Sequence, residues 1–313
     1  MYLLPFFKLT MKFETSPKIE SSAFEKLQAS LKAISVKINE EVKGYLENPK
    51  SVDLVDEECV IRMKSFQKGR RGGPYEEGII KEDEEKVVLK EKSFAPDFTS
   101  PSLQQFYMDK FGAESIEEIE KIWRANQERS QGMQMEMAVT ALLYKVLGKD
   151  YIVVRASKYD DYENGVDNIL VNKRTGDVIC AFDEVRDDEG GERHGSKIKK
   201  LTNKAQRGGA KVKYGLSLRD NGQGKKLLSK EALFHIPTFY LRLSREELDK
   251  LTASMDPGKI DAASAAEIEI FSALVGSLKE QASFLKSLKL PQEVSANLER
   301  FDDFIAEAEK YGE

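Results

Sequence analysis

Hydrophobic and polar positions follow two different periods through the middle of the chain, and together they predict an α/β core. A helical period covers residues 131–147 and is followed by Gly148, a residue typical of helix C-terminal caps. Strand-like runs come next at 151–156, 166–171 and 177–185, and the last two flank a four-residue connection that ends in Gly176. The pattern therefore predicts a helix, a strand and a β-hairpin in succession.

The same analysis extends the core toward residue 245. A polar segment at 196–206 predicts a helix, and runs at 211–218 and 238–243 predict two more strands. The predicted order is α-β-β-β-α-β-β. We expect a mixed sheet flanked by helices for residues 101–245.

The flanking regions predict separate elements. Apolar positions at 3-4-3-4 spacing over 24–38 predict a helix, either packed on its own domain or serving a partner. Short strands are expected at 59–66 and 86–89, so residues 1–100 are predicted to form a small α+β region that ends in the Pro- and Ser-containing stretch 93–102. From 246 to 313, two apolar stripes separated by Pro291 predict a helical extension, either a cap on the core or a route to a homodimer.

Composition narrows the function classes. The chain has 313 residues and a net charge of -5, so any nucleic-acid contact must come from a local basic patch. Two separate cysteines and two histidines argue against a zinc cluster or a disulfide scaffold. The apolar residues 1–7 are too short to span a bilayer and have no basic leader, so a cytoplasmic location is expected, with either Met1 or Met11 as the start.

The predicted hairpin carries acidic residues where strands are usually apolar. If Asn172 pairs with Asp177, the same frame places Asp167 opposite Phe182. Asp167 would then share a sheet face with Glu184 at roughly 7–8 Å, near enough for both to reach one cation. Asp183 would point to the other face. The alternative is an ion-pair network with a structural role.

Glu136 is the only acidic residue in the 131–147 helix. It lies on the same helical face as Val139 and Leu143, so its carboxylate is expected to look toward the core. Stabilisation of the helix N-terminus by this negative charge is the simpler reading.

Glu136, Asp167 and the Glu184-Val185-Arg186 triplet resemble the PD-(D/E)XK nuclease superfamily, whose restriction-endonuclease-like fold carries these acids on a helix and a hairpin. The resemblance covers residues 130–245. Val166 stands where the family usually has Pro, and Arg186 stands where it has Lys. Some members supply the lysine from a neighbouring element, which makes Lys197, Lys199 and Lys200 candidates.

The resemblance implies a divalent-metal-dependent nuclease that hydrolyses phosphodiester bonds, with DNA as the expected substrate. Asp167, Glu184 and the carbonyl of Val185 would bind Mg²⁺ or Mn²⁺, ions that prefer oxygen ligands. Glu136 would hold a second ion or a water molecule, and Arg186 would stabilise negative charge. Because a guanidinium stays protonated and is a poor base, the alternative is a degenerate nuclease-fold protein that binds nucleic acid or a protein partner without cleavage.

A basic strip follows the acidic residues. Residues 193–213 contain eight Lys or Arg and no Asp or Glu. Such a strip suits phosphate neutralisation, although a solvated helix face is an equally simple reading. The residues expected to contact nucleic acid are Lys197, Lys199, Lys200, Lys204 and Arg207.

Overall fold

The computed structural model describes residues 21–47, 53–69, 72–95, 100–186 and 192–312. Of residues 21, 22, 124, 128, 184–186 and 192–197, only the backbone is described. The predicted roles of the side chains of Glu184, Arg186 and Lys197 therefore lie outside the described part, as do the question of the start and the apolar residues 1–7.

Helix α5 (Gln131–Leu147) is the centre of the molecule, with the bounds expected from its periodicity. The Ser130 hydroxyl caps its start by accepting a hydrogen bond from the N–H of Met133, at 3.2 Å. From Gln134 to Leu147 every residue except Glu136 is buried. The helix is covered on several sides because it packs against α1, the sheet and the C-terminal helices. Glu136 therefore marks the place where this part of the helix is accessible to solvent.

The main sheet is mixed, as expected. Its strands β1 (Tyr151–Arg155), β2 (Asn168–Asn172), β3 (Val178–Arg186) and β6 (Thr238–Leu243) lie in the order β1-β2-β3-β6. The first three are antiparallel to one another, and β6 joins β3 in parallel. Because a parallel neighbour requires a long crossover, everything between β3 and β6 leaves the sheet and returns to it.

Part of the crossover segment forms a second sheet. Strands β4 (Ala210–Asp220) and β5 (Lys226–Ile236) pair with each other as a separate antiparallel sheet. The strand expected at 211–218 is confirmed, but β5 was not predicted because its alternation is weak and its burial is only partial. Residues 211–218 therefore belong to this two-stranded sheet and not to the mixed sheet.

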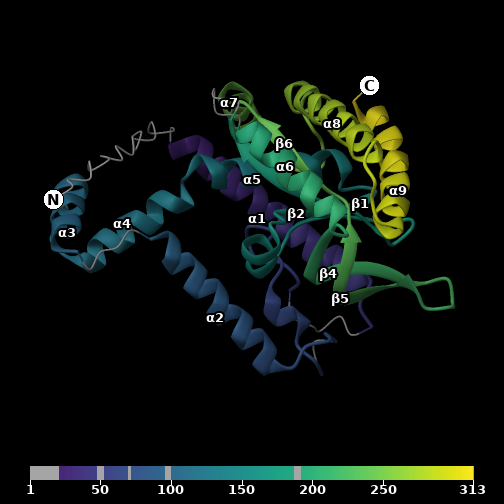
Figure 1. Cartoon of the computed structure of the whole chain (residues 1–313), viewed down its shortest axis with the longest axis horizontal. Coiled ribbons are helices and arrows are strands. Elements are labelled where there is room, and N and C mark those ends of the chain that lie inside the picture. Colours follow the sequence, from purple (N-terminus) through teal and green to yellow (C-terminus); the bar gives the residue numbers. More distant parts are fainter. Residues whose placement is uncertain (1–20, 48–52, 70–71, 96–99, 187–191, 313) are drawn as a thin grey trace, which may run out of the picture.

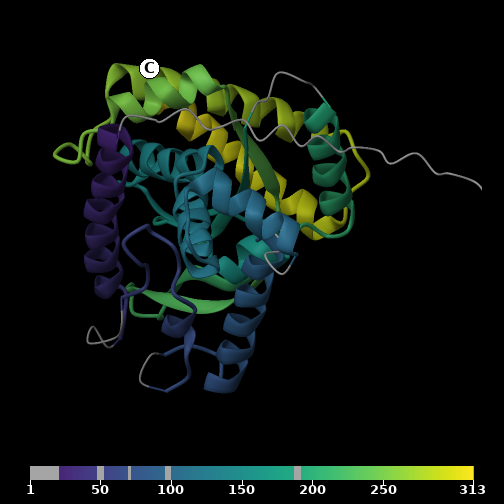
Figure 2. The ribbon, with the colours of Figure 1, turned by 90° about the vertical axis from the view of Figure 1, so that its left-hand side faces the viewer.

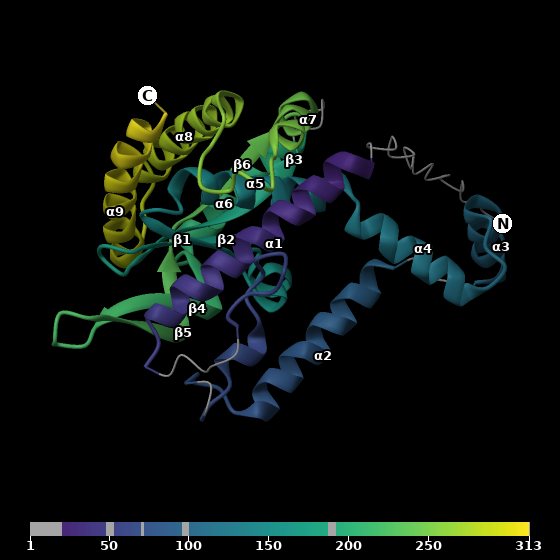
Figure 3. The same cartoon turned by 180° about the vertical axis from the view of Figure 1, so that it is seen from behind.

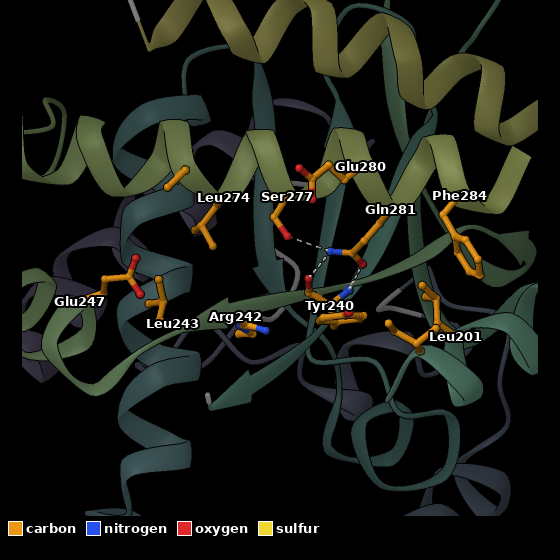
Figure 4. Close-up of a pocket in the computed structure, with 12 residues that line it drawn as sticks. Leu201, Tyr240, Arg242, Leu243, Glu247, Leu274, Ser277, Glu280, Gln281 and Phe284 are labelled. Atoms are coloured by element: carbon orange, nitrogen blue, oxygen red, sulfur yellow. Dashed lines mark hydrogen bonds between the residues drawn. The ribbon is translucent and has the colours of Figure 1, made fainter. Parts of the chain in front are cut away.

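Helices α6 (Glu192–Gln206), α7 (Arg245–Ser254), α8 (Ala265–Lys286) and α9 (Gln292–Ala308) complete the cover (Figure 1). The expected helical hairpin is confirmed as α8 and α9, which pack on each other and on the sheet. Phe301 of α9 stacks on Phe239 of β6 with ring centroids 3.9 Å apart. The Gln281 side chain bonds both the N–H and the carbonyl of Tyr240, and so closes the outer edge of β6 at this residue (Figure 4).

The N-terminal helix α1 (Ser21–Gly44) belongs to the same core. Its apolar residues Leu27, Leu31, Ile34 and Ile38 are buried in the cluster that also contains α5 and the sheet. Figure 2 shows it, in purple, running along one side of the molecule. The reading of this segment as a helix packed on its own domain is confirmed.

Two expected N-terminal strands are wrong. Residues 59–61 form only isolated bridges, among them one beside β1, and Met63–Phe66 is a short 3₁₀ helix. Residues 86–89 lie inside helix α2 (Glu77–Phe94), where flanking charged residues with good helix propensity outweigh the three apolar positions 87–89. Helices α3 (Pro101–Phe111) and α4 (Ile116–Glu128) follow with a small core of their own and stand apart from the sheet (Figure 3).

In the described part of the chain, no helix combines the length and apolar character needed to cross a bilayer.

Candidate functional site

The hairpin frame at the site differs by one residue from the expected one. Near the turn, the N–H of Asn172 donates to the carbonyl of Asp177 at 2.9 Å, and Gly176 has the expected positive φ of 89°. Between Val171 and Leu170 the register shifts, because Ile179 is an extra residue on β3. Asn168, and not Asp167, is therefore paired with Phe182. A β-bulge leaves the hydrophobic alternation nearly unchanged, so the sequence pattern could not reveal it.

An acid of β3 lies beside the site. The Asp183 carboxylate is near enough to Glu136 to raise its pKa. This proximity was not expected, because the predicted frame placed Asp183 on the opposite face. The backbones of Glu184, Val185 and Arg186 pair with β6. Their proposed roles in metal binding and charge stabilisation stay predictions.

Asp167 is fixed by its backbone on both sides. Its N–H donates to the carbonyl of Phe182 and its carbonyl accepts from the N–H of Ala156, each at 2.8 Å. The residue thus connects β1 and β3 directly at the end of β2. Its carboxyl group is only partly buried and hydrogen-bonds with that of Asp161.

Asp161 was not predicted as a site residue. It lies in a short π-helical turn, Asp160–Asn164, which ends at Gly165 with φ of 58°. Turns of this kind often occur at functional sites because they re-aim side chains within a short stretch. The signal in the sequence was the acidic run immediately before the hairpin, but nothing in it distinguishes Asp161 from its neighbours.

The neighbouring Asp160 has a structural role. Its buried carboxylate accepts hydrogen bonds from the backbone N–H groups of Lys213 and Tyr214, at 2.6 and 3.0 Å, and from the Ser157 hydroxyl, at 2.8 Å. These bonds attach the turn to β4. Tyr214 is fully buried and donates to Asp83 at 2.7 Å, so it packs in the core and does not present a ring for stacking.

Glu136 faces the acidic residues from α5, as predicted, and has a cationic partner. The guanidinium of Arg155, at the end of β1, donates to its carboxylate at 2.5 Å. Arg155 is also 3.5 Å from Glu58, on the segment beside β1. The arginine is nearly buried, whereas Glu136 is partly exposed. A positive charge therefore lies within the carboxyl cluster, which we define as Glu136, Asp161, Asp167 and Asp183.

Two carboxyl groups of this cluster have strongly shifted pKa values. Burial raises the pKa of Glu136 to about 7, the Arg155 guanidinium opposes that rise, and the carboxylates of Asp167 and Asp183 add to it. Burial likewise raises the pKa of Asp161 to about 8, and the charges of Asp167 and Glu136 add to the effect. At neutral pH the cluster thus retains protons in place of a full complement of negative charges. Shifts of this size from burial and like charges are typical of functional sites.

These shifts give a pH-dependent stability. The folded protein holds protons on Glu136 and Asp161 that the unfolded chain releases near its ordinary carboxyl pKa, so the free energy of unfolding should fall as pH rises through 7 to 8. We expect a loss on the order of 5 kcal/mol between about pH 5 and pH 8, measured by urea unfolding. Asp161→Asn should remove much of this loss, and the exposed neighbour Glu163→Gln should not. An Asp161→Asn profile parallel to the parent's would contradict the assignment.

Helix α6 contributes to the cluster through Lys204. Its ammonium donates to the carbonyls of Asn164 and Gly165, at 2.6 and 2.9 Å. These carbonyls lie between Asp161 and Asp167, so Lys204 positions the backbone that carries both acids. The contact of Lys204 with nucleic acid stays a prediction beside this internal role, while Lys199 and Lys200 on α6, and Arg207 just after it, are exposed.

A groove lies on the other side of α6, between α6, β6 and α8. It encloses about 460 Å³, and Figure 4 shows Gln281 and Phe284 of α8 opposite Tyr240 and Arg242 of β6. Its lining mixes apolar side chains with Arg242, Glu247 and Glu280, and the acids of the carboxyl cluster are not part of it. The carboxyl cluster remains the place where shifted acids converge.

The carboxyl cluster brings several carboxylate oxygens, which are hard donors, close to one another, so their negative charges repel. Such donors attract protons, an arginine or a divalent cation. No protein-family model, curated protein or solved structure matches this chain.

Proposed function

We propose that the protein is a divalent-metal-dependent nuclease that hydrolyses phosphodiester bonds, with DNA as the expected substrate. One observation carries the proposal: Glu136, Asp161 and Asp167 converge at the end of a mixed sheet, where burial and their like charges raise the pKa of Glu136 to about 7 and that of Asp161 to about 8 although Arg155 opposes both shifts. Glu136 and Asp167 are the same residues that resemble the PD-(D/E)XK pattern. The restriction-endonuclease-like fold is part of this proposal.

The donor types suit Mg²⁺ or Mn²⁺, since carboxylate oxygens are their preferred protein ligands. A bound ion of this kind supplies positive charge for the oxygens of a phosphodiester group. Among the described residues, no three Asp, Glu, His or Cys side chains are grouped to hold a metal ion. The proposal therefore requires Glu184, whose side chain lies outside the described part, or the release of Glu136 from Arg155.

The test is incubation of the purified protein with labelled single-stranded, duplex and branched DNA and with RNA, in Mg²⁺, Mn²⁺ or EDTA. We expect cleavage that depends on the metal and is lost in Asp167→Asn. Arg186→Lys should preserve or raise the activity, because lysine keeps the charge and can exchange a proton. Cleavage that survives EDTA or Asp167→Asn would refute the proposal, and so would a lack of cleavage under every condition.

A specific observation favours a second candidate. The Arg155 guanidinium already neutralises Glu136 inside the cluster, as an internal counterion would in a protein that has lost its metal. This candidate is a nuclease-fold protein that binds nucleic acid or a protein partner without cleaving it. Binding in EDTA, together with the absence of cleavage in Mg²⁺ and Mn²⁺, would support it.

A further inference from the structure

An exposed aromatic ring lies close to the basic end of α6. Phe234, near the end of β5, has 54% of its surface exposed. The next residue, His235, has a positive φ of 61°, a conformation that costs energy for residues other than Gly. His235 Nδ1 donates to the carbonyl of Gly208 at 2.9 Å, and Asn297 donates to the carbonyl of His235 at 2.8 Å. Bonds on both sides thus fix the backbone beside the exposed ring.

A basic hollow adjoins this ring. It measures about 400 Å³ and is lined by Lys200, Asn203, Lys204, Arg207 and Gly209. Gly209 is in close contact with the His235 backbone, since a Cβ added there would lie 2.8 Å from the His235 carbonyl carbon. Lys211 lies beyond, with its ammonium 5.5 Å from the centre of the Phe234 ring. Gly209 and Lys211, only two residues apart, thus connect the hollow to the ring.

The side chains that line this hollow carry positive charge and no negative charge. They are three cationic side chains and an amide, with no carboxylate. In a chain with a net charge of -5, such a lining favours an anionic ligand at this place. Lys204, at its floor, also holds the carbonyls of the turn that carries Asp161, so a bound anion would lie next to the elements that position the carboxyl cluster.

We propose that this α6–β5 surface, made of Lys200, Asn203, Arg207, Lys211, Phe234 and His235, binds a single strand of nucleic acid. Phosphate groups lie in the basic hollow and an unpaired base stacks on Phe234. An exposed ring beside cations is the combination used by proteins that hold unpaired strands, because every base offers a flat face for stacking. Bases inside a duplex are already stacked and cannot use the ring. The inference deepens the proposed nuclease function, on which it rests for its biological meaning, by naming unpaired strands as the substrate class.

The test measures binding in EDTA, where cleavage plays no part. Fluorescence anisotropy with a labelled oligothymidylate should show tighter binding than with a duplex of equal length. Phe234→Ala should weaken single-strand binding about tenfold and leave duplex binding nearly unchanged, because one stacked base is lost. Phe234→Trp should restore it.

Helix α3 offers a matched control. Phe106 is 52% exposed and has the Lys110 ammonium 5.9 Å from its ring, but its place is away from the basic hollow. Phe106→Ala should leave binding unchanged. Arg207→Ala should weaken binding to all sequences alike and lower the salt slope by about 1, whereas Lys121→Ala, at an exposed position on α4, should not.

Each outcome decides the inference. Equal binding of single strand and duplex, an unchanged Phe234→Ala protein, or equal losses from Phe234→Ala and Phe106→Ala would overturn it, provided that circular dichroism shows all variants folded. Failure of the nuclease proposal is separable: a protein that binds the strand in EDTA but does not cleave it keeps this surface and loses the enzyme. A protein that cleaves only duplex DNA would keep the nuclease proposal and lose the single-strand surface.

Discussion

Asp167→Asn is expected to abolish Mn²⁺ binding, measured by calorimetry, while the protein remains folded. The negative charge of Asp167 acts on both acids whose pKa is shifted, because it raises the pKa of Glu136 and of Asp161. Removing it leaves the cluster with too little negative charge to hold a divalent ion. The same removal relieves repulsion, so the variant should unfold at a slightly higher temperature than the parent.

Asp183 and Glu184 are neighbouring acids on β3, and both are candidates for the site. Asp183 lies near enough to Glu136 to raise its pKa, and the resemblance to the PD-(D/E)XK superfamily assigns metal binding to Glu184. We expect Asp183→Asn to weaken Mn²⁺ binding at least tenfold, and the exposed Glu163→Gln to leave it intact. Normal binding in Asp183→Asn would exclude Asp183 as a ligand, and loss of binding in Glu184→Gln would assign that role to Glu184. A parent protein that binds no Mn²⁺ would remove the metal from the proposal.

Lys145→Met is expected to destabilise the protein by about 3–5 kcal/mol, the usual cost of leaving one partner of a buried ion pair alone. The Lys145 ammonium, on α5, lies 2.6 Å from the Glu267 carboxylate on α8, and both side chains are almost completely buried. Glu267 also closes a capping box at the start of α8 through its second oxygen, which accepts from the N–H of Ser264 at 2.6 Å. The variant would bury an uncompensated carboxylate in the centre of the fold.

A second substitution separates charge from packing. Adding Glu267→Gln to Lys145→Met removes the stranded charge and keeps a side chain that can cap α8, so it should recover most of the loss in chemical denaturation. Lys279→Met is the matched control. Its partner Glu309 is at the same 2.6 Å, but the two side chains are 60% and 46% exposed, so the cost should stay below about 1 kcal/mol. Equal losses from Lys145→Met and Lys279→Met would contradict the role of burial.

The two sets of measurements report on separate parts of the molecule. Lys145 and Glu267 connect α5 to α8 inside the core, whereas the carboxyl cluster lies where α5 meets the ends of β1 and β2. A loss of metal binding in Lys145→Met would therefore reflect partial unfolding, while Asp167→Asn should lose binding in a folded protein. Circular dichroism distinguishes the two.

Local patterns were enough to predict most of the elements. The helix at 131–147, the hairpin around Gly176 and the helical pair interrupted by Pro291 depend on periodicity and turn chemistry that act over a few residues, and the structure confirms them. Glu136 faces the acids from α5, as its position on the helix predicted. The wrong assignments were short: four residues at 86–89 are too few to outweigh the helix-forming residues around them.

Only the tertiary structure decided which acids meet. The bulge at Ile179, which shifts the register between β2 and β3 by one residue, leaves no mark on the alternation, because β3 is buried between β2 and β6 and both of its faces are largely apolar. Asp161 joins the cluster because Asp160 and Lys204 attach its turn to β4 and α6, and Arg155 enters it from a strand that carries no motif. Contacts between residues far apart in the chain determine these positions. The sequence by itself determined that acids gather on a helix and a hairpin, and long-range packing selected the four that converge.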